Sequence, residues 1–215
     1  MKQHFVAKPK RTINKTDRRR SHSSNYFSIT AQDYLQYTIK KLKYTVTDIM
    51  IFIHDDAWID GHFIVDRASA GLETFDIVGV AGNRRRTPFQ PSRAFIFDAT
   101  TNSLRWDERQ HLSGAIAHGE GPFGRLSRYG PTGLECELLD GVLLAVKQTT
   151  ILKTGLRFDP RFSFHFYDLD FCRSARTLSL PVGTWPISIT HQSTGSFGSD
   201  SWKQNWNAYL EKWGE

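Results

Sequence analysis

The 215-residue chain has few cysteines and no long hydrophobic run. Its two cysteines, Cys136 and Cys172, are too few for a disulfide framework and indicate a reducing compartment. No run of about 18 apolar residues occurs, so the sequence predicts no transmembrane helix. The basic N-terminus is not followed by a continuous apolar segment and therefore lacks the pattern of a secretory signal. A chain of this length and composition predicts one folded domain with a sizeable core.

Acidic residues are nearly absent from the first twenty positions, where Asp17 is the only one. The cations there exceed the net charge of +6 of the whole chain, so the remainder is close to neutral. We interpret residues 1–30 as a basic, disordered tail and residues 31–215 as a single domain. Such a tail could contact nucleic acid or an anionic membrane, but most are simply solvated, and we expect no nucleic-acid partner. The cations are Lys2, Lys8, Lys10, Arg11, Lys15, Arg18, Arg19 and Arg20.

Apolar patterns in the first half alternate between helix and strand. Residues 31–43 have an apolar face at helical spacing. Residues 48–53 form a nearly continuous apolar run, which is typical of a strand buried on both faces. Residues 62–73 have a helical pattern, and residues 77–81 form a second apolar run. Strand, helix and strand in this order predict a β-α-β unit and an α/β fold.

The second half begins with short strand patterns between turns rich in glycine and proline, and we expect an antiparallel insert or a β-rich half there. Beyond it, residues 149–159 predict a helix capped by Thr149 or Thr150 and stopped at Gly155. The strand patterns of the insert are 93–97, 114–117, 125–129 and 142–146. The later predicted elements are a helix at 169–176, a strand at 185–189 and an amphipathic helix at 202–213.

Acids and one histidine stand at the ends of apolar segments. Asp55 and Asp56 follow the first predicted strand, Asp168 and Asp170 lie in an aromatic segment, and His191 follows the late strand. Acids at the C-terminal end of a buried parallel strand lie where open α/β sheets bind ligands. If these groups converge, carboxylates with one imidazole suit Mn²⁺ or Mg²⁺ better than Zn²⁺, and a free carboxylate could act as general base. The alternative for this segment is an N-capping Asp followed by an amphipathic helix that places Phe171 and Leu178 in the core.

Five segments occur in the order and at the spacing of a known enzyme family. Together they resemble the family 2 glycosyltransferases, which implies the GT-A fold, a Rossmann-type mixed sheet flanked by helices. The resemblance runs from about residue 47 to about residue 200. The segments are Ile51-Phe-Ile-His-Asp-Asp56, Leu139-Asp-Gly-Val-Leu-Leu-Ala-Val-Lys147, Gly155-Leu-Arg-Phe-Asp-Pro-Arg-Phe162, Phe166-Tyr-Asp-Leu-Asp170 and Ile189-Thr-His191.

This resemblance implies an inverting, metal-dependent glycosyltransferase that moves a sugar from a nucleotide-sugar donor to a glycan, a lipid-linked acceptor or another hydroxyl group. Asp56 would bind Mn²⁺ or Mg²⁺ at the donor diphosphate, and His191 matches a histidine that helps to hold the metal. Asp55 would lie near the donor's sugar or ribose. Asp140 and Gly141 would line the donor-sugar and acceptor region.

Asp168 falls at the position of the family's catalytic base. There it would take the proton from the acceptor hydroxyl as that oxygen attacks the anomeric carbon. Asp170 and Arg173 would support Asp168 structurally. The family also suggests glycan assembly in the cytoplasm or at the cytoplasmic face of a membrane.

The chain departs from the family pattern in two places. His54 replaces the first acid of a DxD motif, and nothing before Asp48 resembles the family's base-binding strands. We therefore expect the N-terminal part of the fold to be truncated or replaced, leaving the edge of the 48–53 strand for a homodimer or another partner to cover. The alternative function is a degenerate, non-catalytic GT-A domain that binds sugar or protein. A two-metal phosphoesterase or nuclease is disfavoured because no second dense ligand cluster is visible.

Overall fold

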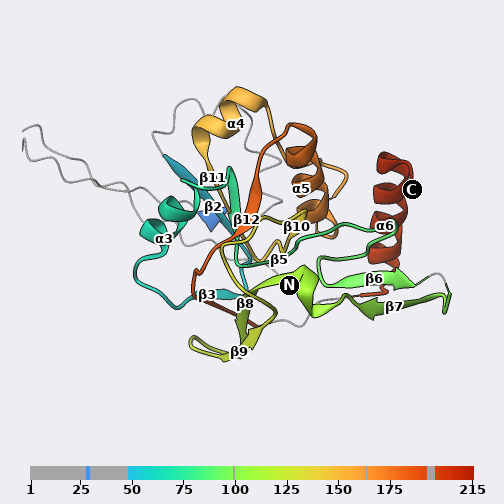
Figure 1. The fold of residues 1–215 in the computed structure, drawn as a ribbon, viewed down its shortest axis with the longest axis horizontal. Coiled ribbons are helices and arrows are strands. Elements are labelled where there is room, and N and C mark those ends of the chain that lie inside the picture. The colour runs from blue at the N-terminus through green and yellow to red at the C-terminus, as the bar shows by residue number, and fades with distance from the viewer. Residues whose placement is uncertain (1–27, 30–47, 99, 163, 193–196) are drawn as a thin grey trace, which may run out of the picture.

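The computed structural model describes residues 28–29, 48–98, 100–162, 164–192 and 197–215. They form a mixed α/β fold, which confirms the predicted α/β class. A five-stranded sheet has helices on one face, and a helix and a second sheet on the other (Figure 1). The helix expected at 31–43 and nearly all of the expected tail lie outside the described residues.

Among the described residues, the central strand of the five-stranded sheet is the only one that has antiparallel neighbours on both sides. This strand, β11, runs antiparallel to both neighbours, whereas the outer pairs are parallel. Leu144 and Val146 of β11 pack into one core, and Leu143 and Ala145 pack into the other. Burial on both faces explains its continuous apolar sequence. The order is β1 (Ser28–Ile29), β2 (Ile49–Ile53), β11 (Leu143–Lys147), β4 (Ile77–Gly79) and β12 (Val182–Thr184).

The edge of β2 that we expected to be open is partly paired within the chain. Ser28 and Ile29, which the sequence analysis placed in the tail, lie parallel to Ile51 and Phe52. Within the part of the chain that the structure describes, this pairing covers two of the five residues of β2.

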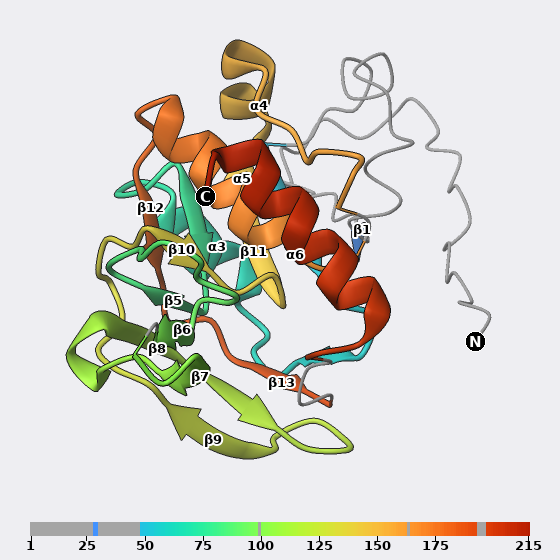
Figure 2. The ribbon, with the colours of Figure 1, turned by 90° about the vertical axis from the view of Figure 1, so that its right-hand side faces the viewer.

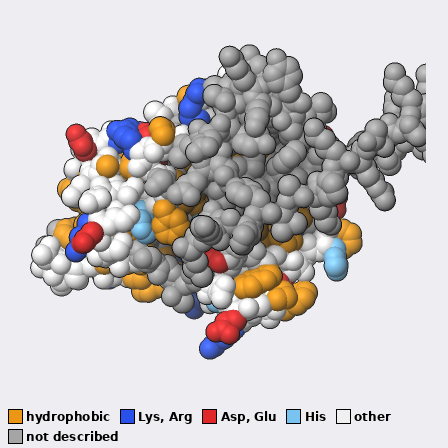
Figure 3. Space-filling model, turned by 180° about the vertical axis from the view of Figure 1, so that it is seen from behind, with side chains coloured by type: hydrophobic (Ala, Val, Ile, Leu, Met, Phe, Trp, Pro, Cys, Tyr) orange, Lys and Arg blue, Asp and Glu red, His pale blue; other side chains and the backbone are white. Residues whose placement is uncertain are grey.

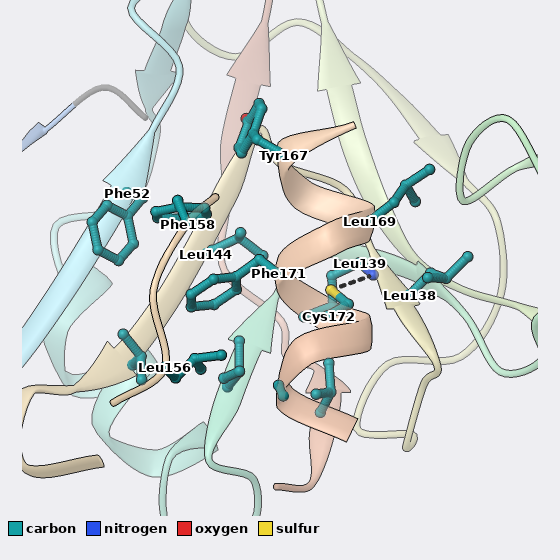
Figure 4. Close-up of a cluster of buried hydrophobic side chains, with 14 of the residues drawn as sticks. Phe52, Leu138, Leu139, Leu144, Leu156, Phe158, Tyr167, Leu169, Phe171 and Cys172 are labelled. Atoms are coloured by element: carbon teal, nitrogen blue, oxygen red, sulfur yellow. Dashed lines mark hydrogen bonds between the residues drawn. The ribbon is translucent and has the colours of Figure 1, made fainter. Parts of the chain in front are cut away.

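One face of this sheet is covered by helices α4 (Gln148–Thr154), α5 (Tyr167–Thr177) and α6 (Asp200–Trp213) (Figure 2). Phe171 of α5 stacks on Phe158 at 4.3 Å between ring centroids, and Phe158 meets Phe52 of β2 edge-on at 5.1 Å (Figure 4). Each fully buried phenylalanine contributes about 1.5–3 kcal/mol. This packing fixes the start of α5 above the end of β2.

The opposite face packs against α3 (Ile64–Gly71) and the second sheet. Two antiparallel pairs, β6 (Phe95–Asp98) with β7 (Ser103–Trp106) and β8 (Leu112–His118) with β9 (Arg125–Arg128), agree with the expected antiparallel insert. The strand expected at 142–146 does not belong to it, because this segment is β11 at the centre of the first sheet. The second sheet has the order β10 (Leu138–Leu139), β5 (Ala81–Asn83), β8 (Leu112–His118), β13 (Ile189–His191) and β3 (Ala57–Ile59), with β9 (Arg125–Arg128) also on β8. The hairpin of β6 (Phe95–Asp98) and β7 (Ser103–Trp106) and the short 3-10 helix Arg109–His111 complete the insert.

Three sequence expectations are corrected. The apolar run at 77–81 divides at Val80, and its two parts join different sheets. The strand expected at 185–189 is instead β12 followed by β13, because Pro186 lacks the N–H that a continuing ladder needs. Helix α4 begins at Gln148 after Lys147, with no side-chain cap, and the Thr150 hydroxyl lies 3.4 Å from an Asp76 carboxylate oxygen instead. Its predicted stop at Gly155, in the left-handed conformation, is confirmed.

The side chain of the last residue, Glu215, connects three segments. Its carboxylate is paired with Arg86, accepts a hydrogen bond from the Phe89 backbone N–H at 2.8 Å and lies 2.9 Å from the Arg173 guanidinium of α5. This side chain is 9% exposed.

On the side seen from behind, the Lys and Arg side chains of the described residues are scattered (Figure 3). None of the helices in the described ranges is long and apolar enough to cross a membrane.

Candidate metal centre

Antiparallel pairing brings the end of β2 beside the start of β11. Leu143 lies opposite Ile53, and the backbone N–H of His54 donates to the Val142 carbonyl at 3.1 Å. Residues 54–56 therefore lie next to 140–142, although more than eighty positions separate them in sequence. Helix α5 begins over the same place, since Gly141 contacts both Tyr167 and Asp168.

The second sheet adds His191 to this place. Strand β13 pairs with β3 so that His191 lies opposite Ala57, the residue after Asp56. The Gln192 N–H also donates to the Asp56 carbonyl at 3.0 Å. Asp56 and His191 are thereby held side by side, as the resemblance implied for the two metal ligands.

His54, Asp56 and His191 form a compact cluster, which we call the His-Asp-His cluster. An Asp56 carboxylate oxygen lies 3.1 Å from Nε2 of His191 and 3.8 Å from Nδ1 of His54. The two ring nitrogens are 3.2 Å apart. Three ligand atoms this close together could hold one metal ion. Two imidazoles and one carboxylate form a donor set typical of divalent transition metals.

The ring nitrogen of His54 that faces away from the cluster contacts a tyrosine. Nε2 of His54 lies 2.7 Å from the Tyr167 hydroxyl, which donates to the Gly141 carbonyl at 3.0 Å. Burial lowers the pKa of His54 below its ordinary value, outweighing the opposite influence of the Asp140 carboxylate. The neutral imidazole, which can bind metal, is therefore favoured.

Asp168 lies in the first turn of α5, beside the cluster. Its carboxylate accepts backbone hydrogen bonds from Gly141 at 3.0 Å and from Leu169 at 2.9 Å. Burial, followed by the nearby charge of Asp140, raises the pKa of Asp168 to about 6. Near neutral pH this carboxylate is ionised but close to its pKa, which suits a group that accepts a proton.

Asp140 has both carboxylate oxygens occupied. One accepts from the Val142 N–H at 3.1 Å and the other from Nε of Arg93 at 2.7 Å. Burial acts to raise the pKa of Asp140, but the Arg93 guanidinium holds it below its ordinary value. The Arg93 guanidinium is stacked over the Tyr129 ring at 4.0 Å. Asp140 is thus a fixed negative charge between His54 and Asp168.

Gly141 is a glycine because its neighbours leave no room for a side chain. A β-carbon there would come within 2.6 Å of Cζ of Tyr167 and 3.0 Å of Cβ of Asp168. Its N–H and its carbonyl are bonded to these same two side chains. The resemblance implied that Gly141 lines the donor-sugar and acceptor region, and within the protein its backbone links Asp168 and Tyr167.

Two of the expected acids are not members of the cluster. Asp55 is exposed and is not one of its three members. Asp170 points the other way from Asp168, where it lies 2.7 Å from the Lys212 ammonium and accepts from the Trp213 indole at 2.9 Å. Burial raises the pKa of Asp170 despite Lys212. The second acid of the aromatic segment thus joins α5 to α6, which agrees with a structural role.

Sequence reasoning missed His54, Tyr167 and Arg93 as parts of the site. His54 was noticed only as a departure from the acid of a DxD motif, although a histidine two positions from Asp56 is itself a metal-binding signal. Tyr167 and Arg93 act through hydrogen bonds that no local pattern reveals.

The chain was also compared with known proteins. No protein-family model matches it, and no match was found among curated proteins.

Proposed function

We propose that the chain is an inverting, metal-dependent glycosyltransferase of the GT-A fold. The proposal is supported by one juxtaposition: a cluster able to hold a divalent cation lies beside a carboxylate whose pKa is about 6. Inverting sugar transfer needs both features, because a negative diphosphate leaves while an acceptor hydroxyl loses its proton. The mixed α/β sheet is compatible with this fold.

In this proposal Asp56 and His191 hold Mn²⁺ or Mg²⁺, and Asp55 lies near the donor's sugar or ribose. The chemistry that the bound cation supplies is neutralisation of the leaving diphosphate. Asp56 is suited to this position because about a third of its side chain, 32%, is exposed and can face a donor. Asp55 is exposed at the same turn.

Asp168 is the general base in the proposed reaction. Two backbone N–H groups hold its carboxylate in one orientation, so it reaches an acceptor hydroxyl without first losing side-chain freedom. Asp140 raises its pKa towards neutrality, which increases its strength as a base. Arg93 in turn keeps Asp140 ionised.

Asp140 and Gly141 would shape the donor-sugar region from behind. The Asp140 carboxylate oxygens and the N–H and carbonyl groups of Gly141 are hydrogen-bonded within the protein. Gly141 thereby positions Asp168 and Tyr167. A sugar hydroxyl could still share the exposed part of the Asp140 carboxylate, whose side chain is 27% exposed.

The proposed partners are a nucleotide-sugar donor and a glycan or lipid-linked acceptor. In this proposal the reaction takes place in the cytoplasm or at the cytoplasmic face of a membrane, as the family resemblance suggests. A homodimer or another protein would cover the part of the β2 edge that the described residues leave unpaired.

Thermal unfolding with Mn²⁺ and a panel of nucleoside diphosphates, followed by assay of sugar release and transfer, tests this function. We expect one nucleoside diphosphate to stabilise the protein only with the metal. Asp168→Asn should abolish transfer while leaving that stabilisation in place, and Asp66→Asn, on the exposed side of α3, should leave transfer unchanged.

Other outcomes would assign other functions. No response to any nucleotide with metal would favour a non-catalytic domain. Cleavage of a generic phosphodiester would favour a phosphoesterase. Retained transfer in Asp168→Asn would refute the role of Asp168.

A further inference from the structure

The resemblance supplies two metal ligands, Asp56 and His191, but the structure brings a second imidazole to the same point. Nδ1 of His54 lies 3.2 Å from Nε2 of His191 and 3.8 Å from the Asp56 carboxylate oxygen. We propose that His54 is the third ligand, and that the resulting two-imidazole, one-carboxylate centre selects a transition-metal dication over Mg²⁺. This inference names the metal class of the proposed function and rests on its cation site.

The spacing of the three atoms agrees with ligands on one ion. Bonds of about 2.1 Å place two ligand atoms about 3.0 Å apart at a right angle and about 3.4 Å apart at a tetrahedral angle. Two of the observed separations, 3.1 and 3.2 Å, lie in this range, and the third, 3.8 Å between Nδ1 of His54 and the Asp56 oxygen, corresponds to an angle wider than tetrahedral. Three ligands leave the remaining coordination positions open for water or for oxygens of a substrate.

The hydrogen bond behind His54 directs its free lone pair into the cluster. In the proposed centre the Tyr167 hydroxyl donates its one proton to the Gly141 carbonyl, which can only accept. In this arrangement Nε2 of His54 carries the ring proton and donates it to the hydroxyl oxygen across the 2.7 Å contact. In the neutral ring, Nδ1 is then unprotonated and faces His191 and Asp56. Metal-binding histidines are oriented by this kind of hydrogen bond on their other nitrogen.

The donor set decides which metal binds. Mg²⁺ dehydrates reluctantly and prefers oxygen ligands. Imidazole nitrogen favours Fe²⁺, Co²⁺ and Zn²⁺, with Mn²⁺ the weakest of the transition series. A site with an acid in place of His54 would offer mainly oxygen, so His54 is the residue that shifts the preference.

A simpler structural explanation makes a different prediction. The same three side chains could share protons as a hydrogen-bonded cluster that only fastens β13 to the end of β2. Divalent metals would then bind weakly, and changing His54 would alter stability without altering a preference among metals.

Metal binding is measured without any nucleotide, using isothermal titration calorimetry with Co²⁺, Mn²⁺ and Mg²⁺ chlorides on the whole chain. We expect one site that binds Co²⁺ at least about 100-fold more tightly than Mg²⁺. Pulsed electron paramagnetic resonance of the Mn²⁺ complex should detect two directly bound ¹⁴N nuclei.

Two variants and one control identify the residues responsible. His54→Asp should reduce the bound ¹⁴N to one and narrow the preference for Co²⁺ over Mg²⁺ by about tenfold or more. Tyr167→Phe should keep both nitrogens but weaken Co²⁺ binding by about 10- to 100-fold, since the orienting hydrogen bond is lost. His62→Gln changes an exposed histidine outside the cluster and should bind metals like the unaltered chain.

Circular dichroism establishes that each variant is folded before it is titrated. The inference is overturned if the unaltered chain binds Co²⁺ and Mg²⁺ with equal affinity, or if its Mn²⁺ complex has fewer than two bound ¹⁴N nuclei. It is also overturned if His62→Gln reduces the preference for Co²⁺ over Mg²⁺ as much as His54→Asp does. Sugar transfer enters none of these measurements. A chain that binds Co²⁺ through two nitrogens but transfers no sugar would therefore refute the proposed function and leave the metal centre standing.

Discussion

Replacing the proposed base by its uncharged analogue, Asp168→Asn, should stabilise the protein at neutral pH. The carboxylate is held where burial and the charge of Asp140 oppose ionisation, so the folded state bears a cost that the unfolded state does not. Because the folded pKa exceeds the unfolded one, this cost is absent below the unfolded pKa. It grows as the pH rises through the interval between the two values and is complete above the folded pKa.

The size of the effect follows from the pKa and the hydrogen bonds. The pKa of Asp168 rises from 3.8 to about 6. At about 1.4 kcal/mol per unit, the ionised group costs about 3 kcal/mol above the folded pKa. Asparagine accepts only one of the two backbone N–H groups that Asp168 accepts, which costs about 1 kcal/mol. The expected net gain is about 2 kcal/mol near pH 7.5, falling to about zero near pH 4.5.

Urea unfolding of both proteins across this pH range measures the difference. In thermal unfolding the gain corresponds to about 4–8 °C near neutral pH for a chain of this size. Asp66→Asn, an exposed change on α3, should produce no comparable difference at either pH. A variant that is no more stable than the unaltered chain at neutral pH, or a gain that does not vary with pH, would refute the reasoning.

Three further predictions concern the same region and its support. Gly141→Ala should destabilise the fold by about 1–3 kcal/mol, because its β-carbon would lie 2.6 Å from Cζ of Tyr167; an unchanged urea midpoint would contradict this. Lys212→Met leaves the buried Asp170 without its cation and should cost about 3–5 kcal/mol near pH 8. That loss should be smaller near pH 5, where burial helps Asp170 to gain a proton, and equal losses at both pH values would count against it. The transfer rate should decline below the folded pKa of Asp168, about 6, and a rate profile flat across that pH would exclude this group as base.

Much of the fold could be predicted because burial leaves a direct trace in sequence. The apolar runs that became β2, β4 and β11 are packed on one or both faces, and the spacing of tryptophans and Tyr209 in α6 matches the face that it buries. The failures occurred where local sequence is ambiguous. Nothing in the apolar run marks Val80 as the point where the chain passes from one sheet to the other. Around Pro186, the apolar residues favoured a strand whereas the proline favoured a break, and the proline decided the structure.

The sequence predicted several residues of the candidate site, but not the hydrogen bonds that connect them. Asp56, Asp168 and His191 all stand at ends of elements, and sheet topology brings such ends together. The part played by His54 depends on Tyr167, whose hydroxyl is fixed by the carbonyl of Gly141. Such a relay spans residues more than one hundred positions apart, and only three-dimensional contacts reveal it.

The Glu215 carboxylate has a consequence for the proposed base, since it is shared by the Arg86–Phe89 loop and by Arg173 of α5. Removing this one anion would leave two guanidinium groups facing each other, and their repulsion would push the loop and the helix apart. Because Asp168 lies on that same helix, removing the Glu215 carboxylate would also make the position of the proposed base less fixed.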